Sequence, residues 1–105
     1  MLKNLKRLRR VAITGIGCVT PIGVGREAFW SSLLDGVSGV RTIESFDVSA
    51  STVKIAAEVR DFDWKAELDP KDRKHVPRTV PLALAAAREA MADAGIETAE
   101  MPIDE

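Results

Sequence analysis

The chain has 105 residues, of which 46% are hydrophobic and 30% are charged, and its formal net charge is −1. These values are typical of a globular protein and exclude a disordered or collagen-like chain. The near-neutral charge also gives no electrostatic reason to expect nucleic acid as a partner.

The cysteine count and the hydropathy exclude further classes. Cys18 is the only cysteine, so the chain can form neither an intrachain disulfide nor a cysteine cluster for zinc. No apolar run approaches the roughly 20 residues that a membrane-spanning helix needs. We therefore expect a cytoplasmic protein that needs no metal or cofactor and has no membrane partner.

The first nine residues are predicted to form a basic N-terminal extension. Residues 1–10 contain five Lys or Arg and no acid, and they lack the continuous apolar stretch of a secretory signal. A solvated extension ahead of the first strand is the simplest interpretation. An organelle-targeting remnant and a phosphate-binding arm are the alternatives.

The next segment predicts a strand, a turn and a helix. Residues 11–14 are a short β-leaning apolar run that ends in Gly15-Ile16-Gly17, which is typical of a buried strand entering a glycine-rich turn. Residues 26–35 predict a helix, because the apolar side chains at 29, 30, 33 and 34 form one stripe. Gly36 is well placed to end it.

The middle of the chain predicts one strand between two irregular segments. Residues 38–51 are mixed in character and predict a loop. In residues 53–59 every second side chain is apolar, which predicts a strand with one buried face. Residues 61–78 are dense in charge and broken by Pro70 and Pro77, so we expect a loop with short helical turns.

Residues 79–94 give the strongest helix prediction in the chain. Thr79 can cap this helix, Pro81 is tolerated in its first turn, and Gly95 can close it. The helix is apolar nearly all round, which is typical of burial on most sides. Two strands and one other helix are too few to cover it, since a two-stranded sheet is marginal alone. The chain is therefore predicted to be a piece of a larger α/β domain, with residues 96–105 as a truncated acidic linker.

The glycine turn also allows a nucleotide-binding hypothesis. Gly15 and Gly17 match the start of a Gly-x-Gly-x-x-Gly motif, but Thr20 stands where the third glycine would be. The predicted helix begins too late to direct its N-terminus at a bound phosphate. A tight chain reversal with close packing is the preferred interpretation, and nucleotide binding is kept only as a third hypothesis.

Cys18 and His75 are the only residues that could supply a thiol–imidazole pair. A nucleophilic cysteine needs a base or a helix N-terminus to stabilise its thiolate, and nothing in the sequence brings His75 near Cys18. We therefore reject Cys18 as a nucleophile and expect it to be a small buried hydrophobic residue.

A basic cluster lies just ahead of the long helix and consists of Lys71, Arg73, Lys74, His75 and Arg78. In a helical turn Lys71, Lys74 and His75 would lie on one face. Neighbouring aspartates dilute the positive charge, so a solvated charged face is the simplest interpretation from the residues alone.

Taken together, these segments resemble the β-ketoacyl-acyl-carrier-protein synthase family, and most closely the ketosynthase II-like condensing enzymes of bacterial type II fatty-acid synthesis. The resemblance runs nearly the whole length of the chain, and the order and spacing of its motifs are specific to this family. The segments that carry it are Arg10–Gly17, Thr20–Gly23, Phe29–Val40, Phe46–Asp47, Ile55–Val59, Asp61–Asp63 and Ala83–Gly95.

The resemblance implies an α/β fold. Residues 10–95 would be the N-terminal portion of a thiolase-like α-β-α-β-α fold that is incomplete in this chain. The implied activity is that of a 3-oxoacyl-acyl-carrier-protein synthase, an acyltransferase. This enzyme joins an acyl thioester to malonyl-carrier protein with loss of carbon dioxide, in fatty-acid or polyketide biosynthesis.

The family's catalytic groups are missing from this sequence. They are a cysteine at a helix N-terminus, two histidines and the backbone amides of an oxyanion hole. The Thr-Ala-Cys-type motif and both histidine motifs are absent. No catalytic residue is assigned, and we expect the chain as given to be inactive.

One functional feature follows from the resemblance. In similar synthases, basic residues before the long helix dock the acidic acyl carrier protein with its phosphopantetheine-linked substrate, and Lys71, Lys74 and His75 occupy similar positions. Pro77 departs from the pattern, because relatives usually have an acidic residue there that continues a helix. A neutral His75 adds little charge at pH 7. The family also implies a homodimer when full length. The alternative function is a non-catalytic truncated module that packs on a partner protein.

Overall fold

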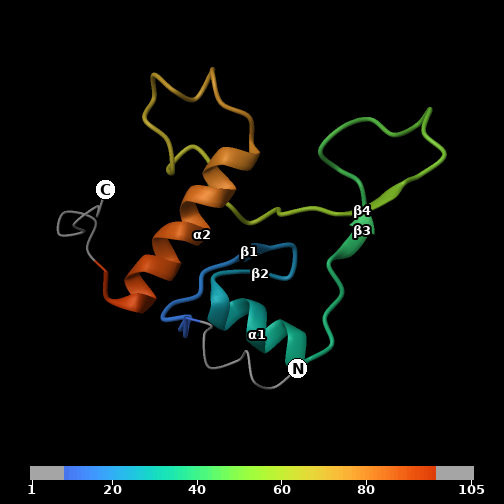
Figure 1. Cartoon of the computed structure of the whole chain (residues 1–105). Coiled ribbons are helices and arrows are strands. Elements are labelled where there is room, and N and C mark those ends of the chain that lie inside the picture. The colour runs from blue at the N-terminus through green and yellow to red at the C-terminus, as the bar shows by residue number, and fades with distance from the viewer. Residues whose placement is uncertain (1–8, 97–105) are drawn as a thin grey trace.

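The computed structural model describes residues 9–96 (Figure 1). The predicted basic extension (1–9) and acidic linker (96–105) lie almost wholly outside the described residues. Along the chain, a short two-stranded hairpin precedes each of the two helices. The strands and helices are β1 (Val19–Thr20), β2 (Gly23–Val24), α1 (Arg26–Leu34), β3 (Val40–Thr42), β4 (Ile55–Ala57) and α2 (Thr79–Ala94).

The glycine-rich segment forms a tight antiparallel hairpin that leads into α1. Val19 pairs with Val24 and Thr20 with Gly23. The Gly25 amide donates to the Cys18 carbonyl at 2.9 Å, which extends the pairing to the residue before α1. The predicted chain reversal is therefore present, although it also contains two short strands.

Helix α1 confirms the prediction for residues 26–35 to within one residue. The Gly36 amide donates to the Leu33 carbonyl, and Gly36 has a φ of 67°, the left-handed conformation that closes helices. The predicted apolar stripe is only partly covered, because Trp30 and Leu34 are 58% and 68% exposed.

The second hairpin pairs β3 with β4 in antiparallel register, with Arg41 opposite Ala56. The prediction of a loop over 38–51 missed β3. The strand predicted over 53–59 is present as β4, but its predicted apolar face is not buried, since Ile55 is 57% exposed. Within residues 9–96 these two strands contact each other and no other helix or strand, so no second element packs on that face.

Helix α2 begins and ends at the predicted residues, and Gly95 closes it with a φ of 68°. The prediction that Thr79 caps the helix was wrong. Arg78 occupies the cap position, and no side chain accepts a hydrogen bond there. Pro81 lies in the first turn as predicted and is fully buried.

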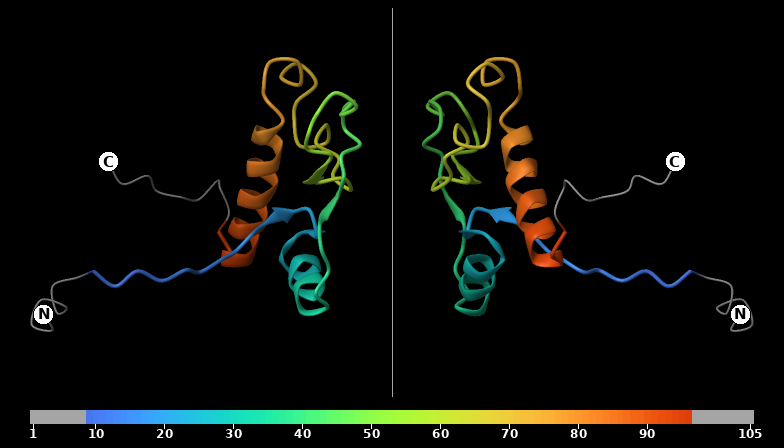
Figure 2. Two further views of the ribbon diagram at one scale, coloured as in Figure 1. Left: turned by 90° about the vertical axis from the view of Figure 1, so that its right-hand side faces the viewer. Right: turned by 90° about the vertical axis from the view of Figure 1, so that its left-hand side faces the viewer.

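The glycine turn lies directly on α2, and both Figure 1 and Figure 2 show the N-terminal segment crossing this helix. A Cβ atom added to Gly17 would overlap the Ala86 carbonyl oxygen, and one added to Gly15 would overlap that of Ala90. Only glycine permits this approach. The glycines and alanines therefore bring two backbones together, as expected for close packing.

The strand predicted over residues 11–14 is not formed. This segment runs out from the rest of the chain (Figure 2), and Val11 and Ile13 are 89% and 84% exposed. A strand requires a neighbour to accept and donate its backbone hydrogen bonds. Among the described residues nothing pairs with this segment.

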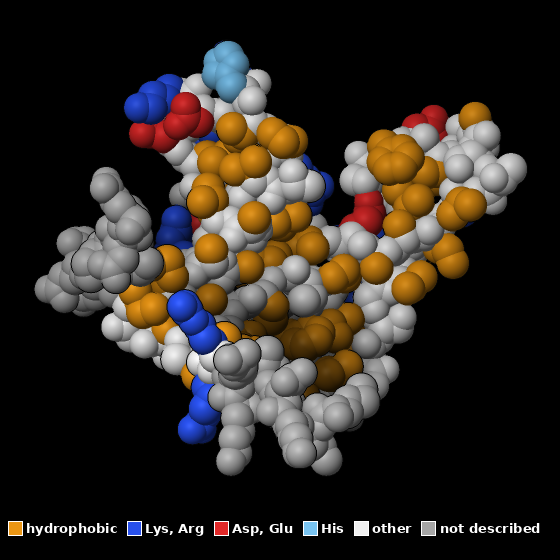
Figure 3. Space-filling model, viewed as in Figure 1, with side chains coloured by type: hydrophobic (Ala, Val, Ile, Leu, Met, Phe, Trp, Pro, Cys, Tyr) orange, Lys and Arg blue, Asp and Glu red, His pale blue; other side chains and the backbone are white. Residues whose placement is uncertain are grey.

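Apolar side chains remain widely exposed over the molecule, as Figure 3 shows for the face that carries α2 and the hairpins. The accessible surface is 9107 Å², whereas a compact protein of this mass would expose about 5,800 Å². No hydrophobic side chain other than Pro81 is fully buried in the described part of the chain. The expectation that α2 is buried on most sides is therefore not met by this chain alone.

Candidate functional site

The predicted docking residues Lys71, Lys74 and His75 all lie exposed on the loop before α2. This loop consists of consecutive turns in which the Asp72 amide donates to the Asp69 carbonyl at 2.9 Å and the His75 amide to the Asp72 carbonyl at 3.0 Å. Bonds between residues three apart place side chains of that spacing on the same side. The loop therefore presents Lys71 and Lys74 together to solvent.

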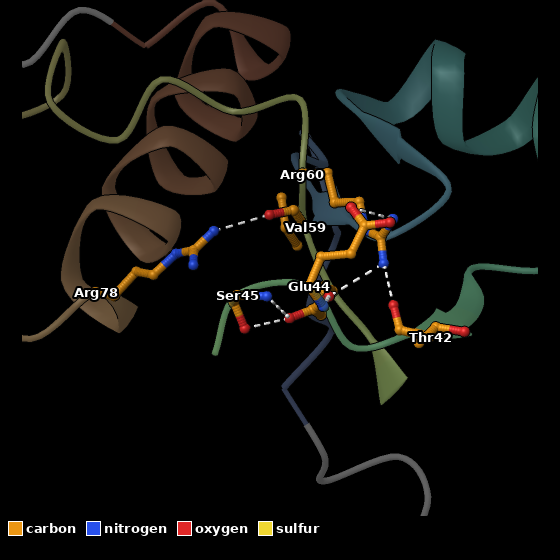
Figure 4. A network of polar contacts seen from close by, with 7 residues as sticks. Thr42, Glu44, Ser45, Val59, Arg60 and Arg78 are labelled. Carbon is orange, nitrogen blue, oxygen red and sulfur yellow. Dashed lines mark hydrogen bonds and ion pairs between the residues drawn. The ribbon is translucent and has the colours of Figure 1, made fainter. Parts of the chain in front are cut away.

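The five basic residues of the cluster divide into two groups. Arg73 Nε donates to the Leu68 carbonyl at 3.3 Å, and Arg78 donates to the Val59 carbonyl at 2.8 Å (Figure 4), so both arginines hold the loop in place. Lys71 Nζ lies 3.6 Å from Asp69 Oδ2, but both side chains are largely exposed, which makes the pair weak. In residues 9–96 no hydrogen bond or ion pair engages the side chain of Lys74 or His75.

Pro77 separates this loop from α2. The Val80 amide donates to the Pro77 carbonyl, and the helix begins only at Thr79. A helix does not run through the basic residues, because proline disfavours helical backbone in the residue before it. The positions of Lys71, Lys74 and His75 therefore depend on the turns of the loop.

A polar network at the second hairpin was not predicted from the sequence (Figure 4). The Glu58 carboxylate accepts bonds from the hydroxyl and the amide of Ser45 and from the Glu44 amide. Hydrogen bonding, first from the Ser45 hydroxyl and then from the Glu44 amide, lowers the pKa of Glu58 to about 2. The opposite charges at Glu58 and Arg60, two residues apart directly after β4, were the available signal.

Arg60 completes that network. Its guanidinium pairs with Glu58 Oε2 at 3.1 Å and Glu44 Oε2 at 3.0 Å, and it donates to the Thr42 carbonyl at 2.6 Å. Among residues 9–96, the polar partners of Arg60 therefore lie in β3, in the loop after it, or directly after β4. The network links β3 and the loop after it to the residues that follow β4, and so holds the hairpin together.

A hollow of about 340 Å³ lies between the first hairpin and residues 58–61, and its lining contains neither cysteine nor histidine. Among the described residues, no three or more His, Cys, Asp or Glu side chains gather in a group that could hold a metal ion. None of the helices within residues 9–96 is long and apolar enough to cross a membrane.

Cys18 is half-buried, whereas the sequence analysis expected it to be buried. Its amide donates to Glu89 Oε2 at 2.9 Å. Burial and the nearby Glu89 charge both raise the pKa of the Cys18 thiol. Because the thiolate is the reactive form, this environment agrees with the rejection of Cys18 as a nucleophile.

The matching family model is that of the beta-ketoacyl synthase, N-terminal domain, and it covers residues 8–104. The chain belongs to the beta-ketoacyl synthase family. A relative from Coxiella burnetii, named 3-oxoacyl-[acyl-carrier-protein] synthase 2, is 46% identical over 88% of this chain. A protein of the same name from Synechocystis is 36% identical over 99%. An oxytetracycline polyketide putative beta-ketoacyl synthase 1 from Streptomyces rimosus is 45% identical over 90%.

A solved structure shows the same beta-ketoacyl synthase fold. The ishigamide ketosynthase/chain length factor matches 89% of this chain with a TM-score of 0.72 and 37% identity. The predicted family and the predicted thiolase-like fold class are thereby confirmed. The chain spans 22% to 25% of the length of the three relatives and 23% of the solved chain.

Within this beta-ketoacyl synthase segment, the structure shows the glycine turn packed on α2 and an exposed basic loop ahead of that helix. The sequence has no Thr-Ala-Cys motif. Its one cysteine follows the glycine turn, and the amide of this cysteine donates to Glu89. The docking role of Lys71, Lys74 and His75 stays a prediction.

Proposed function

We propose that this chain forms the N-terminal part of a 3-oxoacyl-acyl-carrier-protein synthase. Such an enzyme condenses an acyl thioester with malonyl-carrier protein, with loss of carbon dioxide, in fatty-acid or polyketide synthesis. The observation that carries the proposal is the family match over residues 8–104, together with relatives of both pathways at 45–46% identity. We place the reaction in the cytoplasm.

The part of this chain in that function is structural. The glycine turn and α2 pack backbone on backbone, and the exposed apolar side chains on α1, β4 and α2 supply surface for the remainder of a synthase domain. The acyl-accepting cysteine and the two histidines are supplied by sequence that this chain does not contain. We expect the isolated chain to form no β-ketoacyl product from acyl- and malonyl-carrier protein.

The proposed partner is an acidic acyl carrier protein that docks on Lys71, Lys74 and His75. Support comes from the exposure of all three side chains and from the role of Arg73 and Arg78, which hold the loop and leave the lysines to solvent. Attraction between an acidic carrier and exposed lysines would act mainly on the association rate and would weaken with added salt. We also propose that the full synthase is a homodimer.

A hybrid synthase tests the proposal. Residues 9–95 of this chain would replace the matching segment of the Coxiella burnetii relative, and condensation would be measured with carrier-bound substrates. We expect activity within about tenfold of the parent enzyme, because the segment is scaffold and 46% identical. A hybrid synthase that folds stably but has no condensing activity would contradict the proposal and favour the alternative, a module that packs on a partner without catalysis.

Docking is tested in the same hybrid synthase. The double variant Lys71→Glu, Lys74→Glu should lower kcat/KM for carrier-bound substrates by about tenfold or more and leave turnover of a small thioester substrate unchanged. Arg41→Glu is the matched control, because Arg41 is also exposed but lies on β3, outside the loop. Equal losses in the two variants would exclude a docking role for the loop.

A further inference from the structure

Helix α1 begins without a cap of its own. Gly25 precedes it and supplies no side-chain acceptor, so the first amides of the helix need partners from elsewhere. The Arg26 amide donates to Glu89 Oε1 at 2.8 Å, and Glu89 belongs to α2, 63 residues along the chain. A Cβ atom added to Gly25 would lie 3.2 Å from the same oxygen, so the absent side chain at Gly25 leaves room for the carboxylate.

The second oxygen of Glu89 binds the other side of the hairpin. Oε2 accepts the Cys18 amide at 2.9 Å. One carboxylate therefore satisfies the amide at the entrance to the hairpin and the amide at its exit into α1. These two points are also tied directly by the Gly25 amide and the Cys18 carbonyl.

Asp93 repeats this arrangement one turn further along α2. Its Oδ2 accepts the Ile16 amide at 3.0 Å, and its Oδ1 pairs with the Arg26 guanidinium at 2.8 Å. Arg26 Nη1 also lies 3.4 Å from the Ile16 carbonyl oxygen. Residues four apart on a helix lie on the same face, so Glu89 and Asp93 meet the glycine turn side by side.

We propose that Glu89 acts as the N-cap of α1, supplied by α2, and that Glu89 and Asp93 together form a carboxylate clasp that positions the glycine turn and the start of α1. A carboxylate at this position is favoured by the positive end of the helix dipole. The clasp occupies the amides after the glycine turn that a phosphate would need, which gives a structural reason against nucleotide binding. It does not depend on the reaction that the full protein catalyses.

The clasp holds in its ionised form. The Arg26 amide, then the Cys18 amide and the Arg26 charge, lower the pKa of Glu89, and they outweigh burial and the Asp93 charge. The charged or titratable groups around Glu89 are Arg26 and Glu27 from α1, the Cys18 thiol from the turn, and Asp93 from α2. Because the folded pKa lies below the ordinary value of 4.5, the contribution is present above pH 4.5 and is lost as the pH falls below it.

Nuclear magnetic resonance of the full, isotope-labelled chain tests the clasp at a temperature below the broad thermal change, where α1 and α2 are still formed. In the unaltered protein the amide shifts of Cys18 and Arg26 should titrate with one common midpoint below pH 4.5, because both amides sense the same carboxylate. Separate midpoints, a midpoint at the ordinary value, or no titration would overturn the proposal without any variant having to fold.

Amide exchange gives the second measurement. Glu89→Gln keeps the size of the side chain but replaces one acceptor oxygen with a donor, so exchange at Cys18 or Arg26 should speed up by about tenfold or more. Glu27→Gln is the matched control, because this exposed acid lies in the first turn of the same helix. Equal effects of the two variants would overturn the proposal. If Glu89→Gln loses all structure, Asp93→Asn should still speed exchange at Ile16 selectively, and no change at Ile16 would count against the clasp.

Discussion

Two regions of this molecule are held together by different means. The first consists of the glycine turn, the β1–β2 hairpin, α1 and α2, where backbones meet through glycine and alanine and carboxylates reach across 63 to 77 residues of chain. The second is the β3–β4 hairpin, where the Glu58–Arg60 network joins residues close in sequence and its strands contact no other element in the described residues.

The comparison shows that similar polar groups act differently in the two regions. Glu89 binds amides of the turn and of α1 that packing on α2 has already brought close, so each hydrogen bond adds to a non-local contact. Glu58 is half-buried but binds only its own hairpin, whose strands contact no other element in the described residues, so its hydrogen bonds add only to contacts within that hairpin. The first region should therefore stay folded under heat or acid that already unfolds the second. Four experiments test this comparison.

The largest effect is expected from Gly17→Val, measured in the hybrid synthase. The new side chain would overlap the Ala86 carbonyl oxygen, which is backbone and cannot turn aside. We expect a loss of about 3 kcal/mol or more in the free energy of unfolding. Gly36→Ala is the control, since its Cβ would meet no atom of the described residues within 4 Å and only the φ of 67° opposes it, at a cost of about 1 kcal/mol. Equal losses would show that the glycine turn does not need its close approach to α2.

Heating the isolated chain should separate the two regions. Ordering each residue costs about 1–2 kcal/mol of backbone entropy, and burial returns little here because residues 9–96 contain no extended core. We expect helical far-ultraviolet dichroism with a broad thermal change, in which amides of β3 and β4 lose protection before those of α1 and α2. A sharp, reversible melt of a monodisperse monomer would contradict this and favour the non-catalytic module.

Acid should act on the second region through Glu58. The pKa of Glu58 is depressed from 4.5 to about 2, so its contribution is complete above pH 4.5 and is lost as the pH falls from 4.5 towards 2. The amide shifts of Glu44 and Ser45 should titrate with a midpoint near the lower value, and Glu58→Gln should abolish that titration. A midpoint at 4.5 would show that the network does not form in solution.

The smallest effect is expected from Cys18→Ala. The hydrogen bond to Glu89 comes from the backbone amide of Cys18, and the substitution keeps that amide. Replacing a half-buried thiol with a methyl group should cost under about 1.5 kcal/mol and leave acyl-enzyme formation by the hybrid synthase nearly unchanged. Loss of acyl-enzyme in a stable variant would show that Cys18 has a chemical role.

The helices and the family could be predicted from the sequence because their signals are local. The boundaries of α2 follow from a continuous helical pattern ending at Gly95, and α1 follows from its apolar stripe and Gly36. The family follows from the order of short motifs, which needs no coordinates. Even so, the cap predicted at Thr79 was wrong, because Arg78 occupies that position.

The candidate sites were harder to predict. The sequence indicated the exposed basic loop, but not that Arg73 and Arg78 would be tied to carbonyl groups while Lys71 and Lys74 stay in solvent. It showed a carboxylate at position 89 without showing which amides it would meet. The donors and acceptors that a side chain meets depend on how distant segments pack together, and the spacing of residues in the sequence does not specify this packing.

The sequence by itself determined which segments are helical, where each helix ends, and that α2 needs more surface around it than this chain offers. Those properties depend on neighbours within a few residues. The tertiary structure alone decided that the glycine turn lies on α2, that Glu89 reaches the start of α1, and that residues 11–14 find no strand partner among residues 9–96. A strand or a distant cap exists only when another part of the chain supplies the matching donor or acceptor.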